Sequence, residues 1–212
     1  MPNLLPHRHA GDASQYSDFA ALNLGEMNLQ NSDDLKGLAA KADRAIQFLK
    51  QHPTISRSLL LECCHDIDKV ATLIQPILEA PDRSCTYYIQ AVTTGRTAFL
   101  TTNLTPCETD ARSSFTTRIG STWLIGRNRT SSIPLSDPAI SRCHAVIGHT
   151  LNGQFYLMDV GSRNGTSLSG DRLPALERRS LQHGDVISLS HLQAEFFVVS
   201  LRNDFSDQKD ST

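Results

Sequence analysis

The sequence has no long apolar run, either near its first residues or elsewhere. None of its 212 residues fall in an apolar stretch near the ~20 residues that a membrane-spanning helix needs. The opening residues, Met1 to His7, include two prolines and lack the apolar core of a signal peptide. We therefore predict that the protein has no membrane partner.

Cysteine is scarce and shows no pairing pattern. The five cysteines stand at positions 63, 64, 85, 107 and 143, an odd number with no C-x-x-C spacing. This pattern favours neither a disulfide framework nor a zinc site. Neighbouring residues on a helix point about 100° apart, so Cys63 and Cys64 do not face one ligand together. We predict that Cys63 packs in a core, that His65 lies on the surface, that the protein binds no metal or cofactor, and that it is cytoplasmic.

Signatures of catalysis are also missing. The stretch from Gly120 to Arg127 superficially resembles a phosphate loop, but the spacing is wrong and no Gly-Lys-Ser/Thr follows. Gly161-Ser162 lacks the flanking residues of a nucleophile elbow. No pair of carboxylates stands at a spacing that suggests a shared site. We predict that the protein is not an enzyme and has no catalytic residues.

The net charge of −2 hides an uneven distribution. Residues 1–83 carry −3, residues 84–203 carry +3 and residues 204–212 carry −2. A balance of +3 is too small for an electrostatic nucleic-acid binder, so we predict no nucleic-acid partner. All eleven basic residues of the middle segment are arginines, whose planar guanidinium suits bidentate contacts with phosphate.

The first 80 residues predict disorder followed by a helical hairpin. Residues 1–31 show no period and are expected to be disordered. Ser32 and the two acids after it predict a helix start, and apolar residues then recur at helical spacing until His52-Pro53. A second helix is predicted from near Ser56 to about Pro76, which completes a hairpin over 32–80. The apolar area left over must be covered by the β-rich part of the chain that follows, by residues 1–31 or by a second copy of the protein.

From residue 86 onward the hydrophobic period changes from helical spacing to two. Residues 86–92 and 96–100 predict a β-hairpin, and 103–112 a surface insertion. Many short strands with turns between them predict an all-β sandwich over 85–203, with a disordered tail at 204–212. The further strands are expected at 113–119, 122–126, 144–149, 154–160, 166–168, 185–190 and 194–200.

Four motifs follow one another within this β-rich part. They are Gly126-Arg127, Ser141-Arg-Cys-His144, the stretch Asp159-Val-Gly-Ser-Arg-Asn-Gly-Thr166 and Leu181-Gln-His-Gly-Asp-Val-Ile187. Asn164-Gly165 favours a tight turn, because both residues tolerate positive φ. Together the motifs closely resemble the forkhead-associated (FHA) family, over roughly Trp123 to Ser200. The resemblance implies a β-sandwich that binds phosphothreonine peptides through loops at one end.

The resemblance also implies roles for single residues. Arg127 and Ser141 fall on the family's phosphate-binding positions, where Ser141 offers its hydroxyl and its backbone N–H. Arg142 falls on a position where many members have another hydrogen-bond donor to the phosphate. Asn164 falls on the position that grips the ligand's main chain, and Arg163 on one that touches the peptide backbone or flanking residues. Structural support is expected from Gly126, His144, Gly165 and Thr166. Asp159 is predicted to orient Asn164 or neighbouring amides, and Ala139 stands where some members carry an extra arginine.

The sequence therefore predicts a module that docks onto a threonine-phosphorylated protein. The helices would then serve self-association or a second partner. The alternative is a structural scaffold or oligomerisation protein whose FHA fold does not bind phosphopeptide. Regulation of transcription through the helices is disfavoured, because residues 32–80 carry six basic against seven acidic residues.

Overall fold

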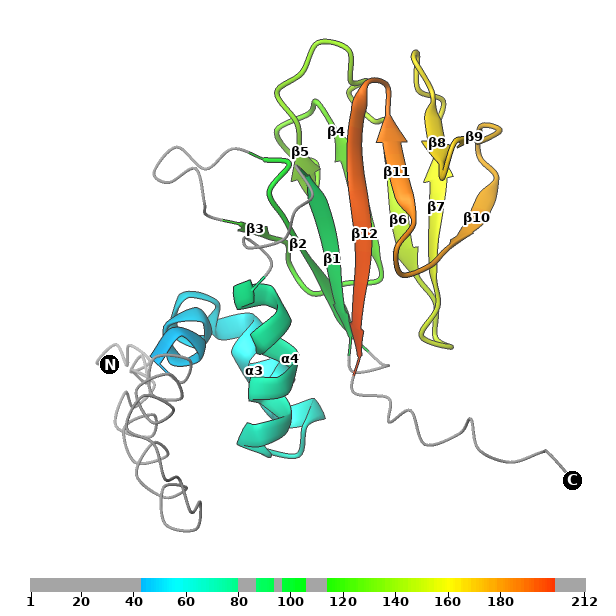
Figure 1. Cartoon of the computed structure of the whole chain (residues 1–212). Helices are drawn as coiled ribbons and strands as arrows, with labels where there is room; N and C mark the ends of the chain where they lie inside the picture. Colours follow the sequence, from blue (N-terminus) through cyan, green and yellow to red (C-terminus); the bar gives the residue numbers. More distant parts are fainter. Residues whose placement is uncertain (1–42, 80–86, 94–96, 106–113, 201–212) are drawn as a thin grey trace, which may run out of the picture.

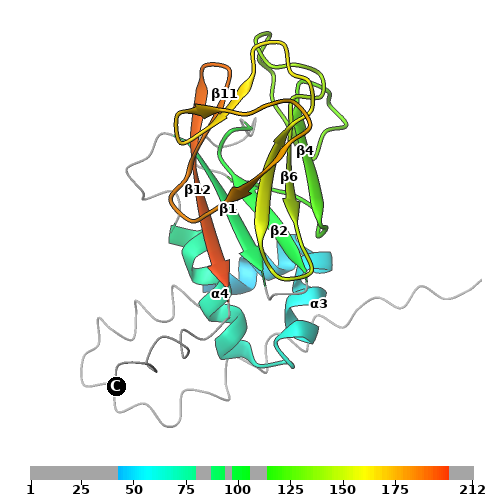
Figure 2. The ribbon, with the colours of Figure 1, turned by 90° about the vertical axis from the view of Figure 1, so that its right-hand side faces the viewer.

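The computed structural model describes residues 43–79, 87–93, 97–105 and 114–200 (Figure 1). Two β-sheets lie face to face as a sandwich, and helices lie across one end of it (Figure 2). The predicted fold class, an all-β sandwich preceded by helices, is confirmed. The disorder predicted for 1–31 and 204–212 concerns residues outside the described ranges.

The larger sheet has seven strands in the order β3-β2-β1-β12-β11-β8-β9, and the smaller has five in the order β10-β7-β6-β4-β5. The seven strands are β1 (Tyr88–Thr93), β2 (Ala98–Thr102), β3 (Phe115–Thr116), β8 (Thr166–Leu168), β9 (Asp171–Arg172), β11 (Val186–Leu189) and β12 (Leu192–Ser200). The five strands are β4 (Thr122–Gly126), β5 (Ile133–Pro134), β6 (Ala145–His149), β7 (Phe155–Asp159) and β10 (Arg178–Leu181).

The hairpin predicted at 86–102 forms and belongs to the sandwich. β1 pairs antiparallel with β2 and, on its other side, parallel with β12. Side chains alternate across a strand, so Ile89 and Ala91 enter the core between the sheets while Val92 points to the outer face. The core between the sheets includes Trp123 and Phe196, both almost fully buried. The start of the domain predicted at residue 85 lies outside the described residues.

The helices differ in one respect from the prediction. Residues 43–51 are helical and end before His52, as predicted, but the second helix is divided into α3 (Pro53–Glu62) and α4 (Ile67–Glu79). The break falls at Cys64 and His65, which have positive φ values of 53° and 60° that no helix can contain. The expected end near Pro76 is wrong, because α4 continues to Glu79. Ile77 is buried there, and this apolar contact opposes the cost of an internal proline.

The apolar face of the helices packs against the outer face of the larger sheet. One buried cluster joins Leu59, Leu73 and Ile74 of the helices to Val92 and Phe99 of the sheet. The sandwich itself therefore covers the apolar area left over by the helices. Cys63 is buried in this cluster and His65 is exposed, as predicted. None of the helices that the structure describes is long and apolar enough to cross a membrane.

Candidate functional site

The residues singled out in the sequence gather at the end of the sandwich opposite the helices (Figure 1). Strands β4 and β7 end there, while β6 and β8 begin there. The connections β4–β5, β5–β6 and β7–β8 therefore meet at one edge, and the turn between β11 and β12 joins them. We call this edge the loop end.

The β4–β5 connection is held against the β5–β6 connection by backbone contacts. The Arg127 N–H donates to the Ser141 carbonyl at 2.9 Å, and the Arg127 Nε donates to the Ile140 carbonyl at 3.2 Å. The guanidinium is exposed but thus tied beside Ser141. A Cβ at Gly126 would collide with the Arg142 carbonyl, so the close approach requires glycine there.

His144 connects the β5–β6 and β7–β8 connections from beneath. Its side chain is fully buried, its Nδ1 accepts the Ser141 N–H at 3.0 Å, and its Nε2 lies 3.2 Å from the Gly165 carbonyl. A backbone N–H can only donate, so Nδ1 is unprotonated and Nε2 carries the hydrogen that goes to Gly165. Burial lowers the pKa of His144, although the bond to Gly165 and the charge of Asp159 act in the opposite direction. The neutral imidazole of His144 thus links the β5–β6 and β7–β8 connections by two hydrogen bonds.

This geometry corrects one sequence-based expectation. The Ser141 N–H was predicted to serve a ligand, but it is donated to His144. The Ser141 Oγ accepts the Arg163 N–H at 3.0 Å, which leaves the hydroxyl hydrogen of Ser141 to donate elsewhere. Ser141 can therefore offer a bound anion one hydroxyl donor but not its amide.

Asp159 is a buried hydrogen-bond acceptor under the β7–β8 connection. Its Oδ1 accepts the N–H groups of Gly161 and Ser162, both at 2.8 Å. Its Oδ2 accepts the hydroxyls of Ser162 at 2.5 Å and Thr166 at 2.6 Å. Burial alone would raise the pKa of Asp159, but these four bonds outweigh it and hold the pKa below its usual value. Asp159 thus orients neighbouring amides, as predicted, and does not bond to Asn164.

Asn164 closes the loop end by reaching the β5–β6 connection. Its Nδ2 donates to the Ala139 carbonyl at 2.8 Å, so Ala139 takes part in the site through its backbone. Arg127, Ser141 and Asn164 are therefore brought together by direct contacts between their connections. Arg142 and Arg163 are exposed beside them.

The sequence motifs did not include two further groups at this end. Arg172 on β9 places its guanidinium against Gly165, where it occupies the space that a Cβ would need. Asp137 accepts the Ala139 N–H at 2.7 Å and pairs with His191 at 3.2 Å, which ties the β11–β12 turn to the Ala139 segment. Asp137-Pro138 is a common turn-initiating pair that could have indicated the second group, but strand β9 gave no such signal.

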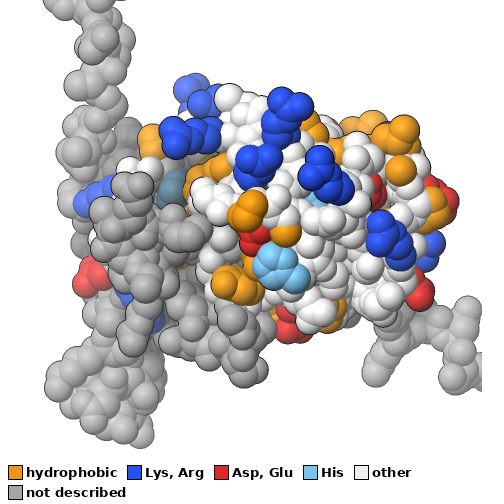
Figure 3. All heavy atoms as spheres, turned by 90° about the horizontal axis from the view of Figure 1, so that it is seen from above, with side chains coloured by type: hydrophobic (Ala, Val, Ile, Leu, Met, Phe, Trp, Pro, Cys, Tyr) orange, Lys and Arg blue, Asp and Glu red, His pale blue; other side chains and the backbone are white. Residues whose placement is uncertain are grey.

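Figure 3 looks down on this end and shows Lys and Arg side chains spread over it. Among the described residues, the ion pairs are Lys69–Asp66 and His191–Asp137, so neither involves an arginine of the loop end. The carboxylate of Asp159 already accepts four hydrogen bonds and is buried. Within the described part of the chain, the arginines of the loop end therefore form no salt bridge with a carboxylate.

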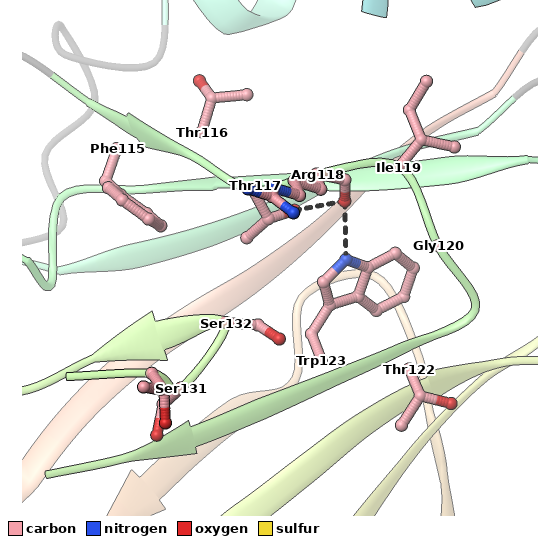
Figure 4. Close-up of a pocket in the computed structure, with 11 residues that line it drawn as sticks. Phe115, Thr116, Thr117, Arg118, Ile119, Gly120, Thr122, Trp123, Ser131 and Ser132 are labelled. Carbon is pink, nitrogen blue, oxygen red and sulfur yellow. Dashed lines mark hydrogen bonds between the residues drawn. The ribbon is translucent and has the colours of Figure 1, made fainter. Parts of the chain in front are cut away.

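A separate hollow of about 540 Å³ lies on the side of the sandwich, between the β3 region and β4 (Figure 4). Thr116, Arg118, Trp123 and Ser131 are among the residues that line it, and the Trp123 Nε1 donates to the Arg118 carbonyl at 3.0 Å. None of the predicted site residues lines this hollow. Within the described ranges, no group of His, Cys, Asp and Glu could hold a metal ion. The predicted site residues thus lie apart from this hollow.

Fold and loop end together define a β-sandwich whose connecting loops expose several arginines at one end. Residues 123–190 match the family model of the FHA domain. The resemblance to the FHA family that the motifs indicated is therefore confirmed for this segment, which is less than half of the chain.

Three similar proteins illustrate the match. Germ layers disorganized gldi-3 of Caenorhabditis elegans is 34% identical over 80 residues, which are 37% of this chain and 8% of that relative. The N-terminal FHA domain of S. cerevisiae Rad53p, solved with a phosphothreonine peptide, is 30% identical over 31% of this chain and 53% of that one, with a TM-score of 0.30. The MEK1 FHA domain, solved with a phosphothreonine peptide of HOP1, is 31% identical over 37% and 81%, with a TM-score of 0.34.

Proposed function

We propose that this protein docks onto threonine-phosphorylated proteins through the loop end of its FHA domain. The observation that supports this function best is the convergence of Arg127, Ser141 and Asn164, which hydrogen bonds between three connections hold in place. These residue types at fixed positions supply a cation, a hydroxyl donor and an amide. A phosphothreonine peptide needs these groups for its phosphate and its main chain.

The division of labour follows from charge and reach. A phosphothreonine carries about two negative charges and three acceptor oxygens at neutral pH. Arg127 would supply the main counter-charge, with its guanidinium already held beside Ser141 by the bond to Ile140. The Ser141 hydroxyl and the exposed Arg142 would bond the remaining oxygens. Asn164 and Arg163 would contact the main chain of the ligand.

The buried residues below this surface would support the loops that form it. His144 and Asp159 fix the backbone of the connections, while Gly126 and Gly165 allow close approaches that a side chain would block. Thr166 anchors the start of β8 through its bond to Asp159. Because these bonds hold the connections in place without a ligand, little conformational entropy of the loops would be lost on binding.

We also propose that the protein is an interaction module rather than an enzyme. The FHA family is generally non-enzymatic, and the one buried histidine of the site already has both ring nitrogens engaged. The apolar face of the helices is buried on the sandwich, so we place the phosphopeptide surface, not the helices, at the centre of the function. Self-association and a cytoplasmic location stay predictions.

Binding of full-length protein to phosphothreonine peptides tests this function. A degenerate phosphothreonine library selects a peptide, which calorimetry then compares in its phosphorylated and unphosphorylated forms. We expect a free energy of binding of about −7 to −8 kcal/mol for the phosphorylated form only. Arg127→Ala should weaken binding by roughly 2–4 kcal/mol, because the phosphate loses its main counter-charge.

Arg57→Ala is the matched control, since Arg57 is an exposed arginine of α3 at the opposite end of the molecule. It removes the same charge and should leave binding unchanged. Equal affinity of wild type and Arg127→Ala for the same peptide would overturn the proposal. Failure of the wild type to select any phosphorylated sequence would favour the alternative, a scaffold whose FHA fold does not bind phosphopeptide.

A further inference from the structure

Arg172 lies at the loop end and, among the described residues, is in neither of the ion pairs. The β8–β9 pairing places Arg172 opposite Ser167, and the Leu173 N–H donates to the Thr166 carbonyl at 2.9 Å. These backbone bonds fix β9 next to the start of β8. The Arg172 side chain then turns toward Gly165, the residue that directly follows Asn164.

The contact with Gly165 gives the guanidinium of Arg172 a defined position. All three atoms nearest to the place of a Gly165 Cβ belong to the guanidinium of Arg172. Gly165 has a φ of +85°, a conformation that favours glycine, and its bare α-carbon leaves room for the planar group. Glycine at this position therefore serves both the turn and the placement of the cation.

The guanidinium of Arg172 forms no ion pair within the described part of the fold. Arg172 is exposed, and neither of the ion pairs there includes it. Its neighbour Asp171 pairs with Leu168, and side chains of successive strand residues point to opposite faces. Asp159, which bonds to Thr166 beside Gly165, is buried with four donors on its carboxylate. A fixed, solvent-facing guanidinium is suited to bidentate contact with a carboxylate or phosphate.

We propose that Arg172 forms a second anion subsite, which binds a carboxylate or a second phosphate on a residue flanking the phosphothreonine. This inference rests on the proposed function, because it places the phosphothreonine at Arg127 and Ser141 and the ligand's main chain at Asn164. Consecutive Cα atoms lie about 3.8 Å apart, so a cation seated on Gly165 is within one or two ligand residues of Asn164. The preferred partner thus carries an acidic or phosphorylated residue close to its phosphothreonine.

Peptide scanning with the full-length protein tests the subsite. The parent peptide has a single phosphothreonine and alanine at the three positions on either side. One series places aspartate at each of these positions in turn, and a second series places phosphoserine there. Each peptide is titrated into wild type, Arg172→Gln, Arg172→Lys and Arg57→Gln, with the melting temperature recorded for every variant.

We expect aspartate to raise the affinity of wild type roughly three- to tenfold at one position or at two adjacent ones. Arg172→Gln should abolish this gain while binding the parent peptide within about twofold of wild type. Arg172→Lys should keep part of the gain, and Arg57→Gln all of it. A larger gain with phosphoserine than with aspartate at the same position assigns the subsite to a second phosphate, and the reverse assigns it to a carboxylate.

Three outcomes would overturn the subsite. A gain in affinity of equal size at all peptide positions would show general electrostatic attraction by the loop end rather than a binding subsite for one side chain. A gain that survives in Arg172→Gln would place the contact elsewhere. Wild type that binds the parent peptide with no gain from any acid would refute the subsite alone, whereas no binding of any phosphorylated peptide would refute the proposed function with it.

Discussion

The two ends of the sandwich are stabilised by different kinds of contact. At the helical end, buried apolar side chains of the helices cover Val92 and Phe99 of the larger sheet. At the loop end, His144 and Asp159 hold the β5–β6 and β7–β8 connections in place with hydrogen bonds to backbone groups and hydroxyls. One end is closed by non-directional burial and the other by directional bonds.

This difference follows from what each end must do. Apolar packing stabilises in proportion to buried area, but it does not fix the position of an exposed polar group. Hydrogen bonds to buried acceptors fix backbone geometry, and they allow arginines and Asn164 to remain in solvent at defined places. Residues whose loss affects stability alone should therefore concentrate at the helical end, and residues whose loss affects stability and binding together should lie under the loop end.

The largest effect on stability is expected at the helical end. Leu73 is fully buried in the cluster between helices and sheet. Leu73→Ala should lower the free energy of unfolding by about 2–5 kcal/mol, because it removes apolar contacts and leaves a cavity. Phosphopeptide affinity of the folded protein should be unchanged in calorimetry. A parallel loss of affinity would show that the two ends are coupled and would break the comparison.

Asp159→Asn probes the loop end with almost no change in volume. The substitution replaces one of the two oxygens that accept four hydrogen bonds by an NH2 group that can only donate. We expect a loss of about 2–4 kcal/mol in stability from buried donors left unpaired. In contrast to Leu73→Ala, the folded variant should also bind the phosphopeptide more weakly, because the β7–β8 connection that carries Arg163 and Asn164 is loosened. Denaturant titration and calorimetry on one sample separate the two effects.

The sequence predicted well those features that local chemistry decides. Strands β4 and β8 have the predicted bounds, because period-two patterns end there at strong turn residues. The convergence of Arg127, Ser141 and Asn164 was implied by the motifs and is present in the structure. Features decided by tertiary contact were missed. The passage of α4 through Pro76 depends on burial of Ile77, and no local pattern indicates that burial.

Short edge strands and long-range contacts were the hardest to predict. Strands β5, β9 and β10 were not predicted, since two of them have only two residues and show no alternation. The contact of Arg172 with Gly165 therefore could not be anticipated, because it depends on β9. The engagement of the Ser141 N–H by His144 is a similar case, since it requires the ring position and not only the spacing of the motif.

The preference for phosphothreonine over phosphoserine is an intermediate test of the loop end. The two residues differ by one methyl group, which in a fitted pocket gives roughly 1–3 kcal/mol of discrimination. We expect the rigid connections around Ser141 and Asn164 to show this preference in wild type. Asp159→Asn should reduce it, and Leu73→Ala should leave it intact. Matched phosphothreonine and phosphoserine peptides that bind wild type equally would show that the loop end has no fitted contact for the methyl group.

The smallest expected effect is a pH dependence that both ends share for different reasons. Burial lowers the pKa of His52 at the helical end and of His144 at the loop end, and also that of His149 on β6. In the unfolded chain a histidine titrates near 6.5, so below about pH 6.5 the unfolded state binds more protons than the folded state. The stability contributed by these neutral imidazoles is therefore complete above that pH and declines as the pH falls toward their lowered values. Melting temperatures between about pH 7.5 and 5 should fall less steeply in His52→Gln and in His144→Gln than in wild type.

The same two variants also separate the two ends by binding. At pH 7.5, His144→Gln should bind the phosphopeptide more weakly, because the hydrogen bonds of His144 to two connections are lost, whereas His52→Gln should bind like wild type. A pH profile of His144→Gln that matches wild type would mean that His144 does not titrate differently in the folded and unfolded states, and equal binding by both variants would remove the distinction between the two ends.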